Sequence, residues 1–124
     1  MTVLLQRHGS ITVAHVNGDI DMANTASLLA AILAGIDVDD VALVLDLSAV
    51  RYLDSAGVQM LFELARHLDT GRRAFAIAIG DGSPARAVLK ITQVEEVASV
   101  RASVDEAIDA VAGTTTRSPR GEKP

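Results

Sequence analysis

Apolar side chains occupy nearly every position of residues 41–48, and a helical pattern follows them. A strand that is apolar along its whole length is typical of one covered on both faces of its sheet. Over residues 55–68, apolar residues recur at helical spacing, which predicts an amphipathic helix packed against the sheet. Asp54 and Ser55 stand at the turn between the two elements. Either side chain is suited to cap the helix, because short oxygen-bearing side chains accept hydrogen bonds from unpaired N–H groups at a helix start.

The rest of the chain shows the same two kinds of pattern. Two β-branched runs around a glycine predict an initial hairpin, and a second apolar run predicts an interior strand parallel to the central one. The remaining spacing predicts further helices and an edge strand. These elements are strands over residues 2–7, 11–17, 74–79 and 97–100, helices over residues 85–91 and 103–112, and a helix capped by Asn24 or Thr25 that buries Leu29, Ile32, Leu33 and Ile36. The predicted fold class is α/β, with a mixed central sheet of about five strands and about four helices.

The length of 124 residues suits one domain with its own core, which we place at residues 1–112. Residues 113–124 lack periodicity, and we expect them to form a disordered C-terminal tail. The net charge of −5 argues against direct binding of nucleic acid, because affinity for phosphates comes mainly from cationic side chains. The chain has no cysteine, no metal-ligand pattern and no apolar run of membrane-spanning length. We therefore expect a cytoplasmic protein without a membrane span, metal or cofactor.

The hydroxyl group of Ser55 is placed for either of two roles. At a helix N-terminus the unpaired N–H groups and the positive end of the helix dipole favour an anion, so a phosphate on Ser55 would be stabilised there. Ser55 would then be a phosphorylation switch, because a phosphate adds about −1.5 to −2 charges beside Asp54 and opposes docking of a partner. In the alternative interpretation Ser55 is only an N-cap that stabilises the helix by about 1 kcal/mol. Local sequence leaves both interpretations open.

Catalysis and acyl-phosphate chemistry have less support in the sequence. Leu53 occupies the position that a glycine would fill in a nucleophile elbow, so Ser55 is not expected to be a catalytic serine. The three histidines are scattered, and none is evidently placed to activate a hydroxyl. A receiver-like phosphoacceptor at Asp46 would be accompanied by an acidic pair after the first strand and a lysine after the last, and this chain has neither. We therefore do not expect an enzyme.

Three motifs resemble the sulfate transporter and anti-sigma factor antagonist (STAS) domain in its single-domain bacterial form. They are Gly18-Asp19-Ile20-Asp21, the stretch from Leu45-Asp46-Leu47-Ser48 to Asp54-Ser55-Ala56-Gly57, and Ser83-Pro84-Ala85-Arg86. The resemblance runs from about Met1 to Val111. Two positions depart from the common pattern, since Asp19 replaces a glutamate and Gln93 stands where many members have glycine.

The resemblance implies that Ser55 is phosphorylated by an anti-sigma factor that is itself a serine kinase. It implies that the unmodified chain binds this anti-sigma factor and frees a sigma factor for transcription, whereas the phosphorylated chain lets go. A metal-dependent serine phosphatase would then restore binding. The same resemblance also allows an alternative, in which the chain is an accessory STAS subunit of a membrane transporter or a scaffold in a stress-signalling complex.

The predicted partner-binding residues come from the motifs and from the helix that follows Ser55. The resemblance places the three aspartates of the first two motifs near the hydroxyl, on the surface that the kinase recognises. The helical pattern places Gln59, Met60 and Glu63 on a flank away from the inward-facing positions. The full predicted set is Asp19, Asp21, Asp54, Ala56, Gly57, Gln59, Met60 and Glu63.

Overall fold

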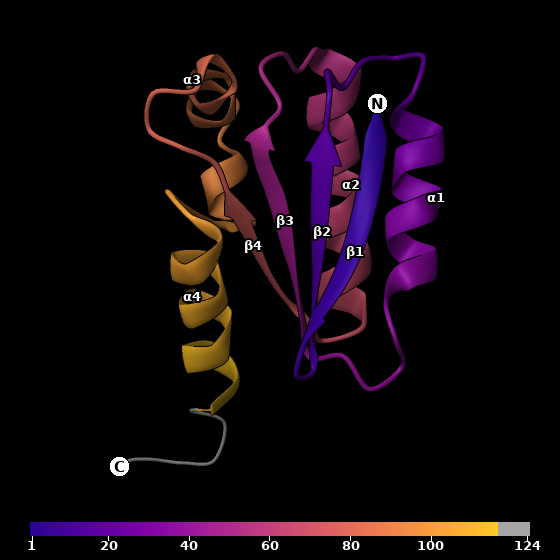
Figure 1. The fold of residues 1–124 in the computed structure, drawn as a ribbon, viewed down its shortest axis with the longest axis vertical. Helices are drawn as coiled ribbons and strands as arrows, with labels where there is room; N and C mark the ends of the chain where they lie inside the picture. The colour runs from indigo at the N-terminus through magenta and orange to yellow at the C-terminus, as the bar shows by residue number, and fades with distance from the viewer. Residues whose placement is uncertain (117–124) are drawn as a thin grey trace.

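The computed structural model describes residues 1–116, in which one five-stranded sheet is covered by four α-helices (Figure 1). This architecture confirms the predicted mixed α/β fold. In chain order the elements are β1 (Thr2–His8), β2 (Ile11–Asn17), α1 (Thr25–Gly35), β3 (Ala42–Ala49), α2 (Ser55–Thr70), β4 (Ala74–Ala78), α3 (Pro84–Ile91), the 3₁₀ helix η1 (Val94–Glu96), β5 (Ser99–Arg101) and α4 (Val104–Thr116).

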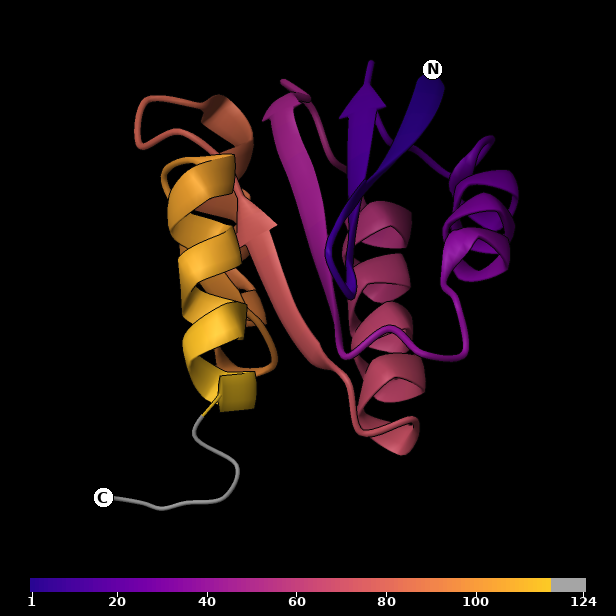
Figure 2. The ribbon, with the colours of Figure 1, turned by 60° about the horizontal axis from the view of Figure 1, so that its bottom comes forward.

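The order of the strands across the sheet is the same as their order in the chain, from β1 at one edge to β5 at the other. β1 and β2 form an antiparallel hairpin, and the pairs from β2 to β5 are parallel. The helices α1 and α2 lie on one face of the sheet, while α4 lies on the other (Figure 2). Because β2, β3 and the start of α2 meet at one end of the sheet, the loops there bring the predicted motifs together (Figure 1).

The central strand β3 is buried on both faces, as its apolar run predicts. Leu43, Leu45 and Leu47 point into the larger core beneath α1 and α2. Ala42 and Val44 point into the smaller core beneath α4. Because successive side chains of a strand point to opposite faces, β3 contributes side chains to both cores. This packing on both faces fixes the end of β3 beside the start of α2.

Three predicted segments differ from the structure. The last helix continues to Thr116 rather than ending at residue 112, so the predicted tail begins inside α4, and residues 117–124 lie outside the described residues. The edge strand is shorter and later than predicted, because residues 94–96 form a 3₁₀ turn before it. In α1 the fully buried side chains are Leu28 and Ile32, while Leu29 and Leu33 are half-buried. The leucine and alanine run of α1 contains several apolar stripes, so its periodicity alone does not select the one that packs.

A buried carboxylate ties the hairpin to the loop before β3. Asp40 is 4% exposed and accepts hydrogen bonds from the Arg7 guanidinium, from Thr12 Oγ1 at 2.5 Å and from the Asp37 N–H at 2.8 Å. Burial alone would raise the pKa of Asp40, but these donors and the positive charge of Arg7 hold it below its ordinary value. Asp40 is therefore a charged structural residue at the end of the sheet opposite Ser55.

Gln93, one of the two residues that depart from the pattern of the resemblance, has a left-handed backbone with φ of 65° and ψ of 28° directly after the cap of α3. A side chain is strained in this conformation and glycine is not. We expect Gln93→Gly to raise the free energy of unfolding by about 1 kcal/mol, measured by urea denaturation. The matched variant Gln59→Gly, in the first turns of α2, should lower it by about 1 kcal/mol. Equal effects of the two variants would contradict the strain at Gln93.

Candidate functional site

Ser55 is the first residue of α2, and its side chain is exposed. The N-cap of this helix is Asp54, whose Oδ1 accepts a hydrogen bond from the Gly57 N–H at 3.0 Å. The interpretation of Ser55 as the N-cap is therefore wrong, since the neighbouring carboxylate takes that role. The hydroxyl group stands at the positive end of the helix dipole and is open to solvent.

Two loops lie side by side at this end of the sheet. Ile20 and Leu53 form a bridge of parallel backbone, in which the Ile20 N–H donates to the Tyr52 carbonyl at 3.0 Å and the Asp54 N–H donates to the Ile20 carbonyl at 3.2 Å. Asp54 Oδ2 also accepts a hydrogen bond from the Met22 N–H at 3.1 Å. One carboxylate thus caps α2 and fastens the loop after β2, so the first predicted motif lies against the second.

The two aspartates that flank Ile20 have different surroundings. Asp19 is exposed. Asp21 is half-buried, and its Oδ1 accepts a hydrogen bond from the Ala23 N–H at 2.9 Å in the turn that leads to α1. Both carboxylates belong to the loop that is tied to Asp54, so negative charge gathers around the start of α2.

Gly57 is buried against the two loops. A Cβ atom at this position would lie 2.4 Å from Leu53 Cδ1 and 3.1 Å from Ile20 Cγ2. Only a glycine lets the first turn of α2 approach this closely. Gly57, predicted as a partner-binding residue, is buried and shapes the junction between the loops from beneath.

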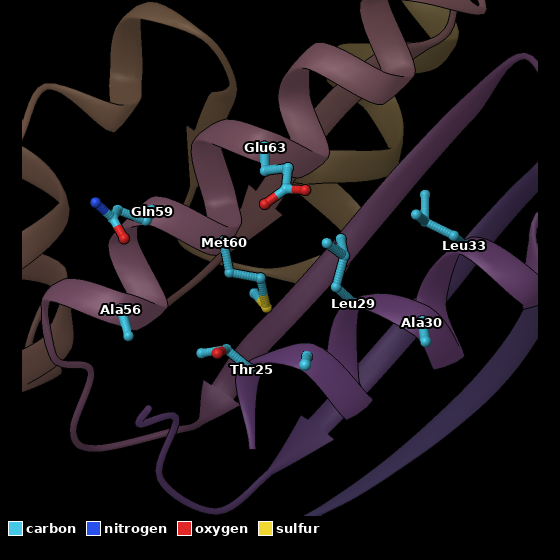
Figure 3. Close-up of a pocket in the computed structure, with 9 residues that line it drawn as sticks. Thr25, Leu29, Ala30, Leu33, Ala56, Gln59, Met60 and Glu63 are labelled. Carbon is cyan, nitrogen blue, oxygen red and sulfur yellow. The ribbon is translucent and has the colours of Figure 1, made fainter. Parts of the chain in front are cut away.

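A groove of about 430 Å³ separates α1 from α2 next to Ser55 (Figure 3). Leu29 and Leu33 of α1 face Met60 of α2 across it, and the exposed side chains of Gln59 and Glu63 stand beside it. The complete lining is Thr25, Ala26, Leu29, Ala30, Leu33, Ala56, Gln59, Met60 and Glu63. The groove combines an apolar interior with a polar margin.

The prediction that Met60 lies on an exposed flank of α2 is wrong. Met60 is only 3% exposed, and its side chain points toward Thr25 and Leu29 of α1 (Figure 3). The helical pattern of α2 does not reveal this burial, because it comes from α1 packing against a second side of the same helix. Met60 therefore forms part of the floor of the groove, between α1 and α2.

Two exposed apolar residues near Ser55 were missed by the sequence analysis. Met22 is 80% exposed in the loop that Asp54 fastens, and Tyr52 is 54% exposed in the loop that precedes α2. Their loops also contain the buried apolar residues Ile20 and Leu53, so the sequence gives no signal that separates the exposed apolar side chains from the buried ones. The two exposed side chains give the surface around Ser55 adaptable apolar contact points beside its carboxylates.

Asp46, the rival phosphoacceptor, lies away from this site. It follows Val44 by two positions in β3, so its side chain lies on the face of the sheet that α4 covers. Its carboxylate accepts hydrogen bonds from the Ser48 hydroxyl at 2.6 Å and the Ser48 N–H at 3.0 Å, and His15 Nδ1 lies 2.6 Å away. Burial alone would raise the pKa of Asp46, but these donors hold it below its ordinary value. The carboxylate is engaged in structure rather than free to accept a phosphoryl group.

Within residues 1–116, no group of three or more His, Cys, Asp or Glu side chains is arranged to hold a metal ion. None of the helices in this part of the chain combines the length and apolarity that crossing a bilayer requires.

Comparison with known proteins identifies the family. The STAS domain family matches residues 2–107. The chain belongs to this family. The motifs that lie together around Ser55 are thus part of a STAS domain that extends over nearly the whole described chain.

Relatives of this STAS domain are named as anti-sigma factor antagonists. The anti-sigma-F factor antagonist RsfB of Mycobacterium tuberculosis is 26% identical over 113 residues, which are 91% of each chain. The crystal structure of an anti-sigma factor antagonist from Mycobacterium paratuberculosis is 30% identical, with a TM-score of 0.80 over 90% of this chain and 93% of that one. The unphosphorylated form of the anti-sigma factor antagonist SpoIIAA shares the fold, with 18% identity and a TM-score of 0.70 over 90% of this chain and 97% of that one.

Proposed function

We propose that this chain is an anti-sigma factor antagonist that binds an anti-sigma factor when Ser55 is unmodified and releases it when Ser55 is phosphorylated. The observation that carries the proposal is the position of Ser55, exposed at the first residue of α2 while Asp54 performs the capping. A hydroxyl that the fold does not use for capping is free to be modified without loss of the helix. The STAS family and the similarity to named antagonists support the same assignment.

In this mechanism a phosphate changes the surface and leaves the fold intact. The start of α2 tolerates an added anion, because its N–H groups and dipole favour negative charge. The phosphate would stand next to Asp54, near the loop that carries Asp19 and Asp21. A partner that covers this surface must then strip water from a dianion among carboxylates, and each tenfold loss of affinity requires only about 1.4 kcal/mol.

The partner surface that we propose joins the loops around Ser55 to the groove between α1 and α2. Met22 and Tyr52 provide apolar contacts on the loops, and Gln59 and Glu63 provide polar contacts beside the groove. Its carboxylates favour a partner segment that carries basic side chains next to apolar ones. The partner would be an anti-sigma factor with serine kinase activity, acting in the cytoplasm, and a metal-dependent serine phosphatase would remove the phosphate. In this role the chain is an interaction module and not an enzyme.

Intact-mass measurement tests the phosphorylation site. After incubation with the anti-sigma kinase encoded in the same genome and ATP, the wild-type chain should gain the mass of one phosphoryl group. Ser55→Ala should gain none, because the acceptor hydroxyl is absent. Ser83→Ala is a matched control, since Ser83 also lies at a helix start but acts as the N-cap of α3, and it should be phosphorylated like the wild type. A mass gain in Ser55→Ala would refute the assignment of Ser55.

Copurification tests the accessory-subunit alternative separately. Recovery of the chain with a transporter ATPase instead of a kinase would favour that alternative.

A further inference from the structure

The strand β1 is a long free edge of the sheet without the usual protection against pairing. It has seven residues, contains no proline, and pairs with β2 in an unbroken register from Thr2 to His8. Its charged side chain is Arg7, and Leu4 and Leu5 are 66% and 39% exposed. The opposite edge, β5, has only three residues. Natural edge strands are normally kept short, charged, bulged or covered, and β1 shows none of these features over residues 2–6.

The free edge offers a set of unpaired backbone groups. The two-residue turn at Gly9 and Ser10 makes the closing pair of His8 and Ile11 a hydrogen-bonded pair, so every second residue of β1 bonds to β2. The N–H and C=O groups of Val3, Leu5 and Arg7 therefore point away from the sheet. No backbone or side-chain group of the described residues bonds to them.

We propose that β1 pairs antiparallel with β1 of a second copy of this chain, forming a continuous sheet across a two-fold axis at Leu5. The strand has an odd number of residues, so the axis places Leu5 opposite Leu5 of the second copy and Val3 opposite Arg7. The outward-pointing N–H and C=O groups of each strand then face the complementary groups of the other strand. Such a contact uses the same surface on both copies and closes as a dimer.

The helix α4 covers only part of its face of the sheet, and the side chains of β1 on the uncovered part suit contact with a second copy. In Figure 1 and Figure 2, α4 lies over the β4 side of the sheet, far from β1. Leu4 projects on this uncovered part of the α4 face, because it pairs with His15, which lies two positions beyond Val13 of the smaller core. In the proposed pairing the two Leu4 side chains are diagonal neighbours across the axis and shield one another from water.

Charge also favours this edge over other surfaces for self-association. The chain carries a net charge of −5, so two copies repel each other overall. β1 contains no Asp or Glu, and Arg7 is paired with Asp37 and Asp40 of its own chain. The centre of the contact is therefore uncharged. Ser55 lies on α2 and not on β1, so the proposed dimer and the phosphorylation site are separate surfaces.

Sedimentation equilibrium of the full chain over a concentration series tests the dimer. We expect the average mass of the wild type to rise from that of one chain toward that of two. Leu4→Lys should raise the dissociation constant of the dimer by roughly tenfold or more, because an edge lysine opposes strand pairing. Ile91→Lys makes the same change at a side chain that is 80% exposed at the end of α3, and it should associate like the wild type. A wild type that remains a single chain at all concentrations, or a Leu4→Lys variant that associates normally, would overturn the proposal.

Cross-linking tests the register of the pairing independently. The natural chain has no cysteine, so Leu5→Cys introduces a single thiol. Two residues that face each other in a hydrogen-bonded antiparallel pair have Cα atoms about 5.5 Å apart, which a disulfide spans. Under a mild oxidant Leu5→Cys should become a covalent dimer much faster than Ile91→Cys. Equal rates would refute the axis at Leu5. Leu5→Pro removes an outward N–H without breaking the ladder to β2, so it should lose association more than Leu5→Ala, which removes the same packing against Gly35 and keeps the N–H.

Discussion

Ser55→Glu is expected to weaken binding of the anti-sigma factor by roughly 100-fold, which corresponds to about 2.8 kcal/mol, while the melting temperature stays within a few degrees of the wild type. The glutamate places a permanent charge at the start of α2, where the helix dipole favours it but a docked partner must desolvate it beside Asp54. Isothermal titration of the purified anti-sigma factor with each variant measures the change. Ser55→Ala should bind like the wild type, because it removes the switch and leaves the surface neutral.

A glutamate at a second serine provides the matched control for the charge added in Ser55→Glu. Ser27 is exposed in the first turns of α1, and it is not part of the groove lining. Ser27→Glu adds the same charge at a comparable helix position, so it should change the affinity less than about threefold. Equal losses from Ser27→Glu and Ser55→Glu would mean that net charge opposes binding and that the position of Ser55 has no special role. Wild-type affinity in Ser55→Glu would contradict the proposed mechanism.

Asp40→Ala is expected to lower the free energy of unfolding by about 3 kcal/mol at neutral pH, measured by urea denaturation. The substitution removes the acceptor for Arg7, the Thr12 hydroxyl and the Asp37 N–H, and it leaves the buried hydroxyl without an acceptor for its proton. Asp39→Ala is the control, because this neighbouring aspartate is exposed and its removal should change stability by less than about 0.5 kcal/mol. Similar effects of the two variants would show that the buried cluster contributes little.

The Asp40 carboxylate also makes the free energy of unfolding depend on pH. The pKa of Asp40 is lower in the folded chain than its ordinary value, which is about 4 and applies to the unfolded chain. The ionised group therefore stabilises the fold fully above about pH 4, and this contribution is lost as the pH falls through the lower folded pKa. Asp40→Ala should lose less stability than the wild type between neutral and acidic pH. Parallel pH profiles of the two chains would contradict this role of Asp40.

The spacing of apolar and polar residues over short stretches of sequence predicted most of the fold. The doubly buried strand β3 and the amphipathic α2 are recognisable because each burial pattern repeats within a few residues. The helix start at residue 55 follows from the same reasoning, since polar oxygen-bearing residues separate the two apolar patterns. The third helix was predicted over residues 85–91, and the structure places it at Pro84–Ile91 with Ser83 as its N-cap.

The site depended on contacts between segments that are distant in the sequence. Whether Asp54 or Ser55 caps α2 is not decided by residue type, because both side chains are able to cap. The loop after β2 helps to decide it, since its Met22 N–H bonds to the second oxygen of Asp54. The burial of Met60 likewise depends on where α1 packs against α2, and the periodicity of α2 carries no information about that second neighbour.

The amino-acid sequence by itself determined the order and type of the elements and placed a serine at the junction between a buried strand and a helix. It could do so because secondary structure and burial of one face are set by local spacing. Only the tertiary structure decided that the Ser55 hydroxyl is exposed and free of capping, that Gly57 and Met60 lie beneath the surface, and that β1 leaves a free edge. These properties arise from packing between remote segments, so they exist only once the chain has folded.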